Sequence, residues 1–387
     1  MENGTSARSV PTCLGDGTSS FVRHEGKDME DGRQRFSGEG IMYSPKRRFR
    51  LFRHPAWAGG GEIDDSTVYT YTWAEQTGAP SQRYAAISVD DTGDTMITAQ
   101  WSAAASANQG TWVSTDSGAT WTRKITGMTF VGSTQTNNPV FARSNPNIAY
   151  VTNTSDYLYK SINKGDTWTA ITGSAPFNAA RMWNCVHCSS DGTNVVAAIT
   201  GGAMYKSTNG GTTWTELTGA GTTRAWDEVI ISDDGQVIAG CAFNAFIYVS
   251  TNGGTTWTSN TGEGQRLWRG LSASSDGRVL FASSVTGALP NGGAVLSKDS
   301  GQTWTEVTSS VGGTGDYWDT ATSINGAKLV VARTTGSIHI SQDGGTTWSA
   351  QATPGTGKTW DGIGMSPDGK TIIVGRNTGR PWVATGS

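Results

Sequence analysis

The chain has 387 residues, a formal net charge of −3 and an isoelectric point near 5.8. This balance provides no overall attraction to nucleic acid or anionic membranes, and no apolar run reaches the roughly 18 residues of a membrane-spanning helix. Glycine contributes 52 residues and charged residues only 16%, which favours an all-β protein with many tight turns.

Residues 1–65 are predicted to form an extended, polar N-terminal arm. The basic residues of this arm cluster at Lys46, Arg47, Arg48, Arg50 and Arg53. One interpretation is an anchor for an acidic protein surface or a polyanion, with only weak binding of nucleic acid; the alternative is a solvated arm. The first residues lack an apolar stretch, so no secretory signal is expected and the compartment stays open.

From residue 66 onward, a repeat with a period of 43 to 47 residues organises the chain. An octapeptide of the form Ser-x-Asp/Asn-x-Gly-x-Thr-Trp begins at Ser114, Ser161, Ser207, Ser250, Ser297 and Ser341. A unit of this length holds four short strands, which is one blade of a β-propeller. Alternating apolar and polar residues predict the strands, and Asp-Gly and Asn-Gly pairs predict the turns between them.

The octapeptide resembles the Asp-box, or BNR, repeat of sialidases, sortilin-type receptors, xyloglucanase-type glycosidases and photosystem II assembly factors. This resemblance covers roughly residues 66–387. It implies a hairpin turn between the third and fourth strands of each blade, in which the acidic residue caps turn amides and the Trp packs into the blade. Asn163, Asn209 and Asn252 replace aspartate in three copies, which keeps the acceptor oxygen and removes the charge. We therefore expect a structural role for these turns, and no metal site.

The last repeat is incomplete, because aligning Trp382 with Tyr248 places Gly386 at the Asp position and the box stops there. Residues 66–78 carry Thr72-Trp73, which matches Thr256-Trp257. We predict that this N-terminal strand completes the last blade and closes the ring without a covalent bond. One box-type tryptophan per blade then predicts a single seven-bladed β-propeller over residues 66–387: Trp73, Trp121, Trp168, Trp214, Trp257, Trp304 and Trp348.

A second repeated feature is an aromatic residue near the start of the first strand in most blades, with a basic residue close by. The aromatics are Tyr84, Trp183, Trp226, Trp268, Trp318 and Trp360, and the basic residues are Arg83, Arg181, Arg224, Arg266 and Lys358. Because the first strand of a blade lines the central channel, this rim is a candidate site for stacking on sugar rings or for holding an acidic partner. The alternative is that each ring packs between blades and is buried.

Carboxylates follow three of these tryptophans, at Asp227, Asp319 and Asp361, with Glu228 nearby. A glycosidase needs two such groups about 5–9 Å apart, whereas carboxylates paired with arginines would count against catalysis. The tyrosine nucleophile and arginine triad that a sialidase requires cannot be assigned, and xyloglucanase-type enzymes work in a cleft between two propellers. Cys185 and Cys188 form a single Cys-x-x-Cys pair, too few ligands for structural zinc.

The sequence thus favours a non-catalytic scaffold that docks a protein or glycan partner within a larger assembly, such as a virion or cell-surface structure. No cofactor or metal is expected. The alternative is a divergent glycoside hydrolase or sialidase-like enzyme.

Overall fold

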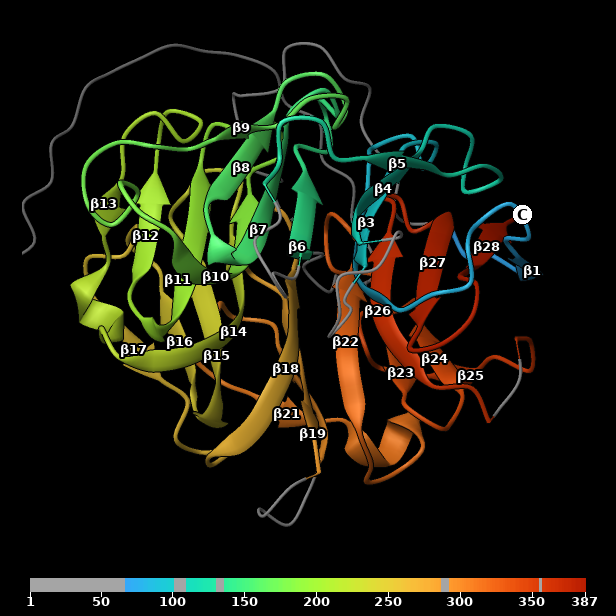
Figure 1. Cartoon of the computed structure of the whole chain (residues 1–387). Helices are drawn as coiled ribbons and strands as arrows, with labels where there is room; N and C mark the ends of the chain where they lie inside the picture. Colours follow the sequence, from blue (N-terminus) through green and yellow to red (C-terminus); the bar gives the residue numbers. More distant parts are fainter. Residues whose placement is uncertain (1–66, 101–108, 130–135, 287–291, 355–356) are drawn as a thin grey trace, which may run out of the picture. The chain divides into compact units, whose positions relative to one another are not determined.

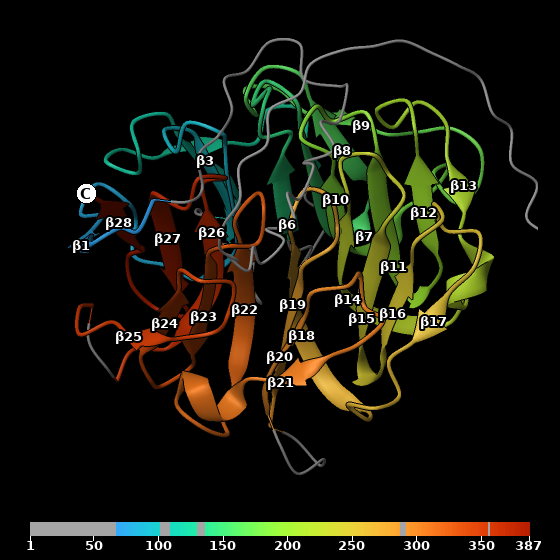
Figure 2. The same cartoon turned by 180° about the vertical axis from the view of Figure 1, so that it is seen from behind.

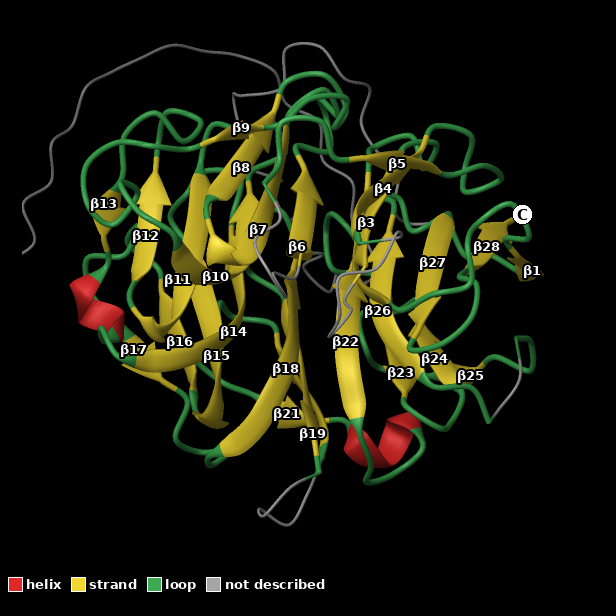
Figure 3. Cartoon of the chain, viewed as in Figure 1, coloured by secondary structure: helices red, strands yellow, loops and turns green. Residues whose placement is uncertain are grey.

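The computed structural model describes residues 67–100, 109–129, 136–286, 292–354 and 357–387. Their regular structure is β-strand apart from two 3-10 turns, η1 (Thr218–Ala220) and η2 (Thr308–Val311) (Figure 3). The expected basic arm, including residues 46–53, lies outside the described residues. Within the described chain, no helix has the length and apolarity needed to cross a membrane.

Antiparallel pairing joins the strands in groups of four, which we call blades and name by their first strand. The β2 blade contains β2 (Tyr84–Val89), β3 (Met96–Gln100), β4 (Gly110–Ser114) and β5 (Thr122–Lys124). The β6 blade contains β6 (Thr136–Phe141), β7 (Ala149–Asp156), β8 (Leu158–Ser161) and β9 (Thr169–Ala170). The β10 blade contains β10 (Arg181–Cys188), β11 (Val195–Gly202), β12 (Met204–Ser207) and β13 (Thr215–Glu216).

The remaining blades repeat this order of strands. The β14 blade contains β14 (Arg224–Ile231), β15 (Ile238–Ala245), β16 (Ile247–Ser250) and β17 (Thr258–Ser259). The β18 blade contains β18 (Arg266–Ala273), β19 (Leu280–Val285), β20 (Gly293–Ser297) and β21 (Thr305–Glu306). The β22 blade contains β22 (Tyr317–Thr322), β23 (Leu329–Arg333), β24 (Ile338–Ser341) and β25 (Ser349–Ala350).

The β26 blade combines the two ends of the described chain. It contains β26 (Trp360–Met365), β27 (Thr371–Arg376), β28 (Trp382–Gly386) and, as its fourth strand, β1 (Tyr71–Glu75). Ala74 pairs with Val383, just as Thr258 pairs with Val249 in the β14 blade, so β1 has the register of a fourth strand. Figures 1 and 2 show β1 beside β28 from both sides. This pairing confirms that the N-terminal strand closes the last blade.

The octapeptide turns are held by side-chain hydrogen bonds to the backbone. In the turn after β16, the Ser250 hydroxyl accepts the Gly254 N–H at 2.9 Å and donates to Asn252 Oδ1 at 3.0 Å. Asn252 Oδ1 also accepts the Thr256 N–H at 2.9 Å. These bonds give the turn amides acceptors from within the octapeptide, so the repeat specifies the turn locally.

Hydrophobic clusters fill the space between neighbouring blades. Cys188 lies in one cluster with Trp183 and Tyr205, whereas Cys185 lies in the next cluster with Trp226 and Tyr248. Residues three apart in a strand point to opposite faces. The two thiols therefore belong to different interfaces and act as small core side chains.

Candidate functional site

The first strands of the blades enclose a central channel. Each first strand contacts the first strands of both neighbouring blades, and β26 contacts β2, which closes the circle. The residues that face this channel come from strands far apart in sequence. This position makes the channel the candidate functional site.

A β-bulge in the first strands decides which side chains face the channel. In β10, β14 and β18, the pairing register skips the residue directly after the aromatic: Asn184, Asp227 and Arg269 respectively. The skipped residues are two in β22, Trp318 and Asp319, and two in β26, Asp361 and Gly362. Such bulges re-aim a side chain locally. All of these except Gly362 line one chamber of about 150 Å³ in the channel.

Trp318 and two arginines form the mouth of this chamber. Trp318 is half-buried, and the Arg269 guanidinium lies 4.7 Å from its ring centroid. The Arg83 guanidinium lies 5.7 Å from the same ring. Arg269 also lies 4.8 Å from the ring of Phe243, which is 39% exposed. Arginine over aromatic faces is a favourable cation–π arrangement. We call Phe243, Arg269 and Trp318 the Trp318 surface.

Each arginine of the mouth is paired with a carboxylate. Arg83 donates to the buried Asp361, and Arg269 Nη1 donates to Asp227 Oδ1 at 3.0 Å. Burial raises the pKa of Asp227 to about 6, although the Arg269 charge opposes the rise. The mouth is therefore close to charge balance, and its arginines are fixed in place.

Two further acids constrict the channel below the mouth. Both carboxylate oxygens of Glu228 accept from Asn138 Nδ2, at 2.9 and 2.8 Å. Asp319 accepts the backbone N–H of Ile363 and of Thr320, each at 2.7 Å. Burial raises the pKa of Asp319 to about 7 and holds the pKa of Glu228 well above its ordinary value, and neighbouring carboxylates add to both rises.

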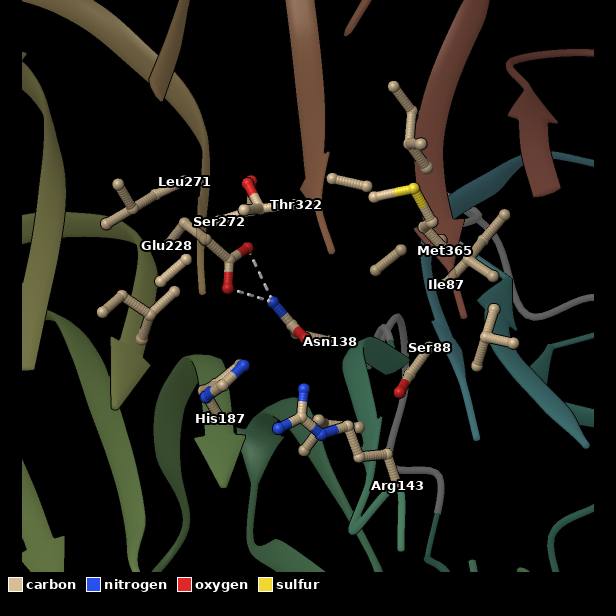
Figure 4. A pocket seen from close by; sticks show the side chains of 18 of the residues that line it. Ile87, Ser88, Asn138, Arg143, His187, Glu228, Leu271, Ser272, Thr322 and Met365 are labelled. Carbon is tan, nitrogen blue, oxygen red and sulfur yellow. Dashed lines mark hydrogen bonds between the residues drawn. The ribbon is translucent and has the colours of Figure 1, made fainter. Parts of the chain in front are cut away.

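A second chamber of about 180 Å³ lies beyond this constriction (Figure 4). Arg143 enters it and donates to Asp233 at 2.8 Å. His187 points into the same space, and its Nδ1 accepts the Ile231 N–H at 3.2 Å. Burial, followed by the Arg143 charge, lowers the pKa of His187 to about 4, so the ring is neutral with its proton on Nε2. Ile87, Leu271 and Met365 add apolar side chains to its lining.

The structure places most of the expected aromatic rim in the interior. Tyr84, Trp183, Trp226, Trp268 and Trp360 are no more than 1% exposed. Several indoles donate to a backbone carbonyl of the preceding blade, such as that of Trp226 to Gly202 at 3.1 Å. Buried rings offer no face to a ligand. These five aromatic residues therefore pack between blades, which is the alternative that the sequence left open.

Trp318 differs from these five residues because Tyr317 takes the packing position in the β22 blade. Tyr317 is fully buried and donates to the Val311 carbonyl at 2.8 Å. Trp318 is thereby turned toward the channel. The sequence pattern had matched Trp318 to Trp226, whereas in the structure Tyr317, one residue earlier, holds the position that matches Trp226.

The expected basic residues are likewise dispersed, and only Arg83 lines the channel mouth. Arg181 is exposed, and Arg224 donates to the Ala220 carbonyl at 2.7 Å. Arg266 pairs with Glu306 at 2.7 Å and with Glu263 at 3.1 Å, and Lys358 donates to the Pro354 carbonyl. None of these four residues lines either chamber of the channel, so they do not form a shared binding rim.

Sequence reasoning missed Asn138, Arg143, His187 and Arg269. A signal for Arg269 was present, because it directly follows Trp268 as Asp227 follows Trp226. Aligning the residues that directly follow the aromatic of each blade would have identified a set of positions that line the channel. His187 and Arg143 carry no such signal, since their approach depends on how neighbouring blades pack.

Comparison with known proteins identifies the fold. No protein-family model matches the chain, and no curated protein matches it in sequence. Among solved structures, it is similar to YCF48 from Cyanidioschyzon merolae, with 16% identity and a TM-score of 0.59 over 80% of this chain and 98% of that one. A structure described as YCF48 bound to D1 peptide gives 14% identity, a TM-score of 0.58, and coverage of 83% and 98%.

The xyloglucanase of family GH74 from Xanthomonas campestris is similar over 80% of this chain, with 14% identity and a TM-score of 0.58. This chain spans about half, 53%, of that enzyme. These likenesses show a β-propeller fold and, at such identities, nothing about activity.

Proposed function

We propose that this chain is a non-catalytic propeller module of the Asp-box type that docks a protein partner on its Trp318 surface, as part of a larger assembly. The observation that carries the proposal is the partly exposed group of Phe243, Arg269 and Trp318 at the channel mouth, in which the guanidinium lies over both rings. Tryptophan and arginine dominate the binding energy of protein interfaces. Because Asp227 holds the Arg269 guanidinium, little side-chain entropy is lost when a partner binds.

The bonding of the carboxylates argues for binding over catalysis. Asp227 and Asp361 are paired with arginines, and Asp319 and Glu228 accept from backbone and amide groups. These bonds give each of the four acids a structural role that requires no substrate. The similarity to YCF48 along nearly its whole length, including a structure with a bound peptide, agrees with a protein partner.

A selection from a phage-displayed library of random 12-residue peptides against the immobilised full chain tests the proposal. We expect selected peptides to lose about 30-fold in affinity in Trp318→Ala, the size of an interface hot spot. Ile162→Ala is the control, because Ile162 is apolar and 71% exposed but lies in an outer turn. Peptides that bind Trp318→Ala as tightly as the native chain would refute this surface.

One observation favours the alternative of a glycoside hydrolase. Burial raises the pKa of Asp319 to about 7, with the Asp361 carboxylate adding to the rise, and a general acid with a raised pKa is what a glycosidase uses. Incubation with xyloglucan and with aryl glycosides between pH 5 and 8 decides the matter. Sugar release that Asp319→Asn abolishes would establish the enzyme and overturn the binding module.

A further inference from the structure

A cavity of about 270 Å³ lies on the flank of the β10 blade, larger than either chamber of the channel. It is formed by the loop that follows β9, at residues 171–177, together with Tyr205 of β12, Glu216 of β13 and Trp214, which directly precedes β13. None of its lining residues lines the channel. The cavity is therefore a separate candidate site.

A stack of three aromatic rings forms its base. Phe177 stacks between Trp183 and Trp214, with ring centroids 4.8 Å away on each side and interplanar angles of 25° and 26°. Tyr205 meets Phe177 edge-on, at 5.7 Å and 78°. Trp214 is half-buried, so part of its indole borders the cavity while Phe177 holds it in place.

The next blade shows that Phe177 departs from the repeat. There Trp226, Tyr248 and Trp257 occupy the places of Trp183, Tyr205 and Trp214, and the buried Ala220 of η1 fills the place of Phe177. The ring of Phe177 thus replaces a methyl group beside Trp214 and distinguishes the β10 blade from the β14 blade at the edge of the cavity.

Polar groups surround the aromatic base. Thr172, Ser174 and the exposed Glu216 line the cavity, together with Thr212 and Thr213 of the octapeptide turn. Thr213 Oγ1 accepts from Asn209 Nδ2 at 2.8 Å, which leaves its own hydroxyl hydrogen to donate elsewhere. Glu216 is the charged residue among the lining residues, and no lysine or arginine is among them.

We propose that this cavity binds a neutral sugar ring. A pyranose has an apolar C–H face that matches the indole of Trp214 and hydroxyl groups that match Glu216 and the threonines. A cavity of about 150 Å³ holds a six-membered ring such as benzene, so the volume here suffices for a substituted one. The carboxylate of Glu216, the charged group of the lining, disfavours acidic sugars.

Saturation-transfer NMR on the full chain tests the site with methyl β-glucoside, methyl β-galactoside, methyl α-mannoside and N-acetylglucosamine. We expect at least one to bind, and Trp214→Ala to weaken its binding about tenfold or more through loss of stacking. Trp257→Ala is the matched control, because Trp257 has the same place in the next blade and should leave sugar binding unchanged.

Glu216→Gln provides a second variant that does not depend on core packing, because Glu216 is exposed. It should weaken binding severalfold while the thermal midpoint is unchanged. Choline serves as a competing probe, since rings beside a carboxylate also suit a quaternary ammonium group. Binding of choline but of no sugar, or sugar binding that survives both Trp214→Ala and Glu216→Gln, would overturn the proposal. Trp318→Ala should leave sugar binding intact, which separates this site from the Trp318 surface.

Discussion

The stability of the Asp319→Asn variant relative to the native chain should increase as the pH rises. In the folded chain the pKa of Asp319 is raised from 3.8 to about 7, first by burial. Between these values the folded state holds a proton that the unfolded state has released, so the stability of the native chain falls as pH increases. The fall is about 1.4 kcal/mol per pH unit, or about 3 kcal/mol between pH 5 and pH 7. This is an upper value, because the half-buried side chain keeps some contact with channel water.

Asparagine resembles the protonated acid because it is uncharged and presents one donor group. Its single oxygen can accept only one of the two backbone N–H groups, because Ile363 donates to Oδ2 of Asp319 and Thr320 donates to Oδ1. The free energy of unfolding of the variant minus that of the native chain should therefore be negative near pH 4, by about 1–2 kcal/mol for the lost bond, and should rise by about 2–3 kcal/mol between pH 4 and pH 8. Urea unfolding followed by tryptophan fluorescence at a series of pH values measures this difference. Asp94→Asn is the control, because it makes the same chemical change at an exposed position. If the free energy of unfolding of the variant minus that of the native chain stays constant or falls with rising pH, the reasoning is refuted.

Three further perturbations test the packing. Trp73→Ala should lower the free energy of unfolding by about 3–5 kcal/mol, because Trp73 is only 8% exposed in the closing strand. Val68→Ala, at a 72% exposed position, should change it by less than about 0.5 kcal/mol. Equal effects of the two substitutions in urea unfolding would contradict the closure of the ring by β1. The double variant Trp226→Ala, Trp268→Ala should unfold, since both side chains are buried in the core. A circular dichroism spectrum with native β-structure would show instead that these two tryptophans are not needed for the core. Ser250→Ala should cost about 1–2 kcal/mol, because it leaves the Gly254 N–H without its side-chain acceptor, and an unchanged thermal midpoint would show that the turn does not depend on this bond.

The architecture could be predicted because it depends on short-range sequence patterns. The octapeptide specifies a turn through bonds among its own residues, as between Ser250 and Gly254, so its repetition places the strands on either side. The incomplete last repeat and the isolated Thr72-Trp73 also predicted that β1 pairs with β28, as the register confirms. These features need no knowledge of distant contacts, and the sequence alone determined them.

The candidate site depends on geometry that no local pattern carries. A bulge of one or two residues decides whether Tyr317 or Trp318 packs in the core, and it places Asp227 and Arg269 in the channel. Which side chains then meet is determined by how neighbouring blades close around one axis, as when Glu228 reaches Asn138, 90 residues away in the sequence. Composition and spacing thus determined the ring and its closure. Only the tertiary structure decided which side chains face the channel, because strand alternation shifts at each bulge and the partners come from different blades.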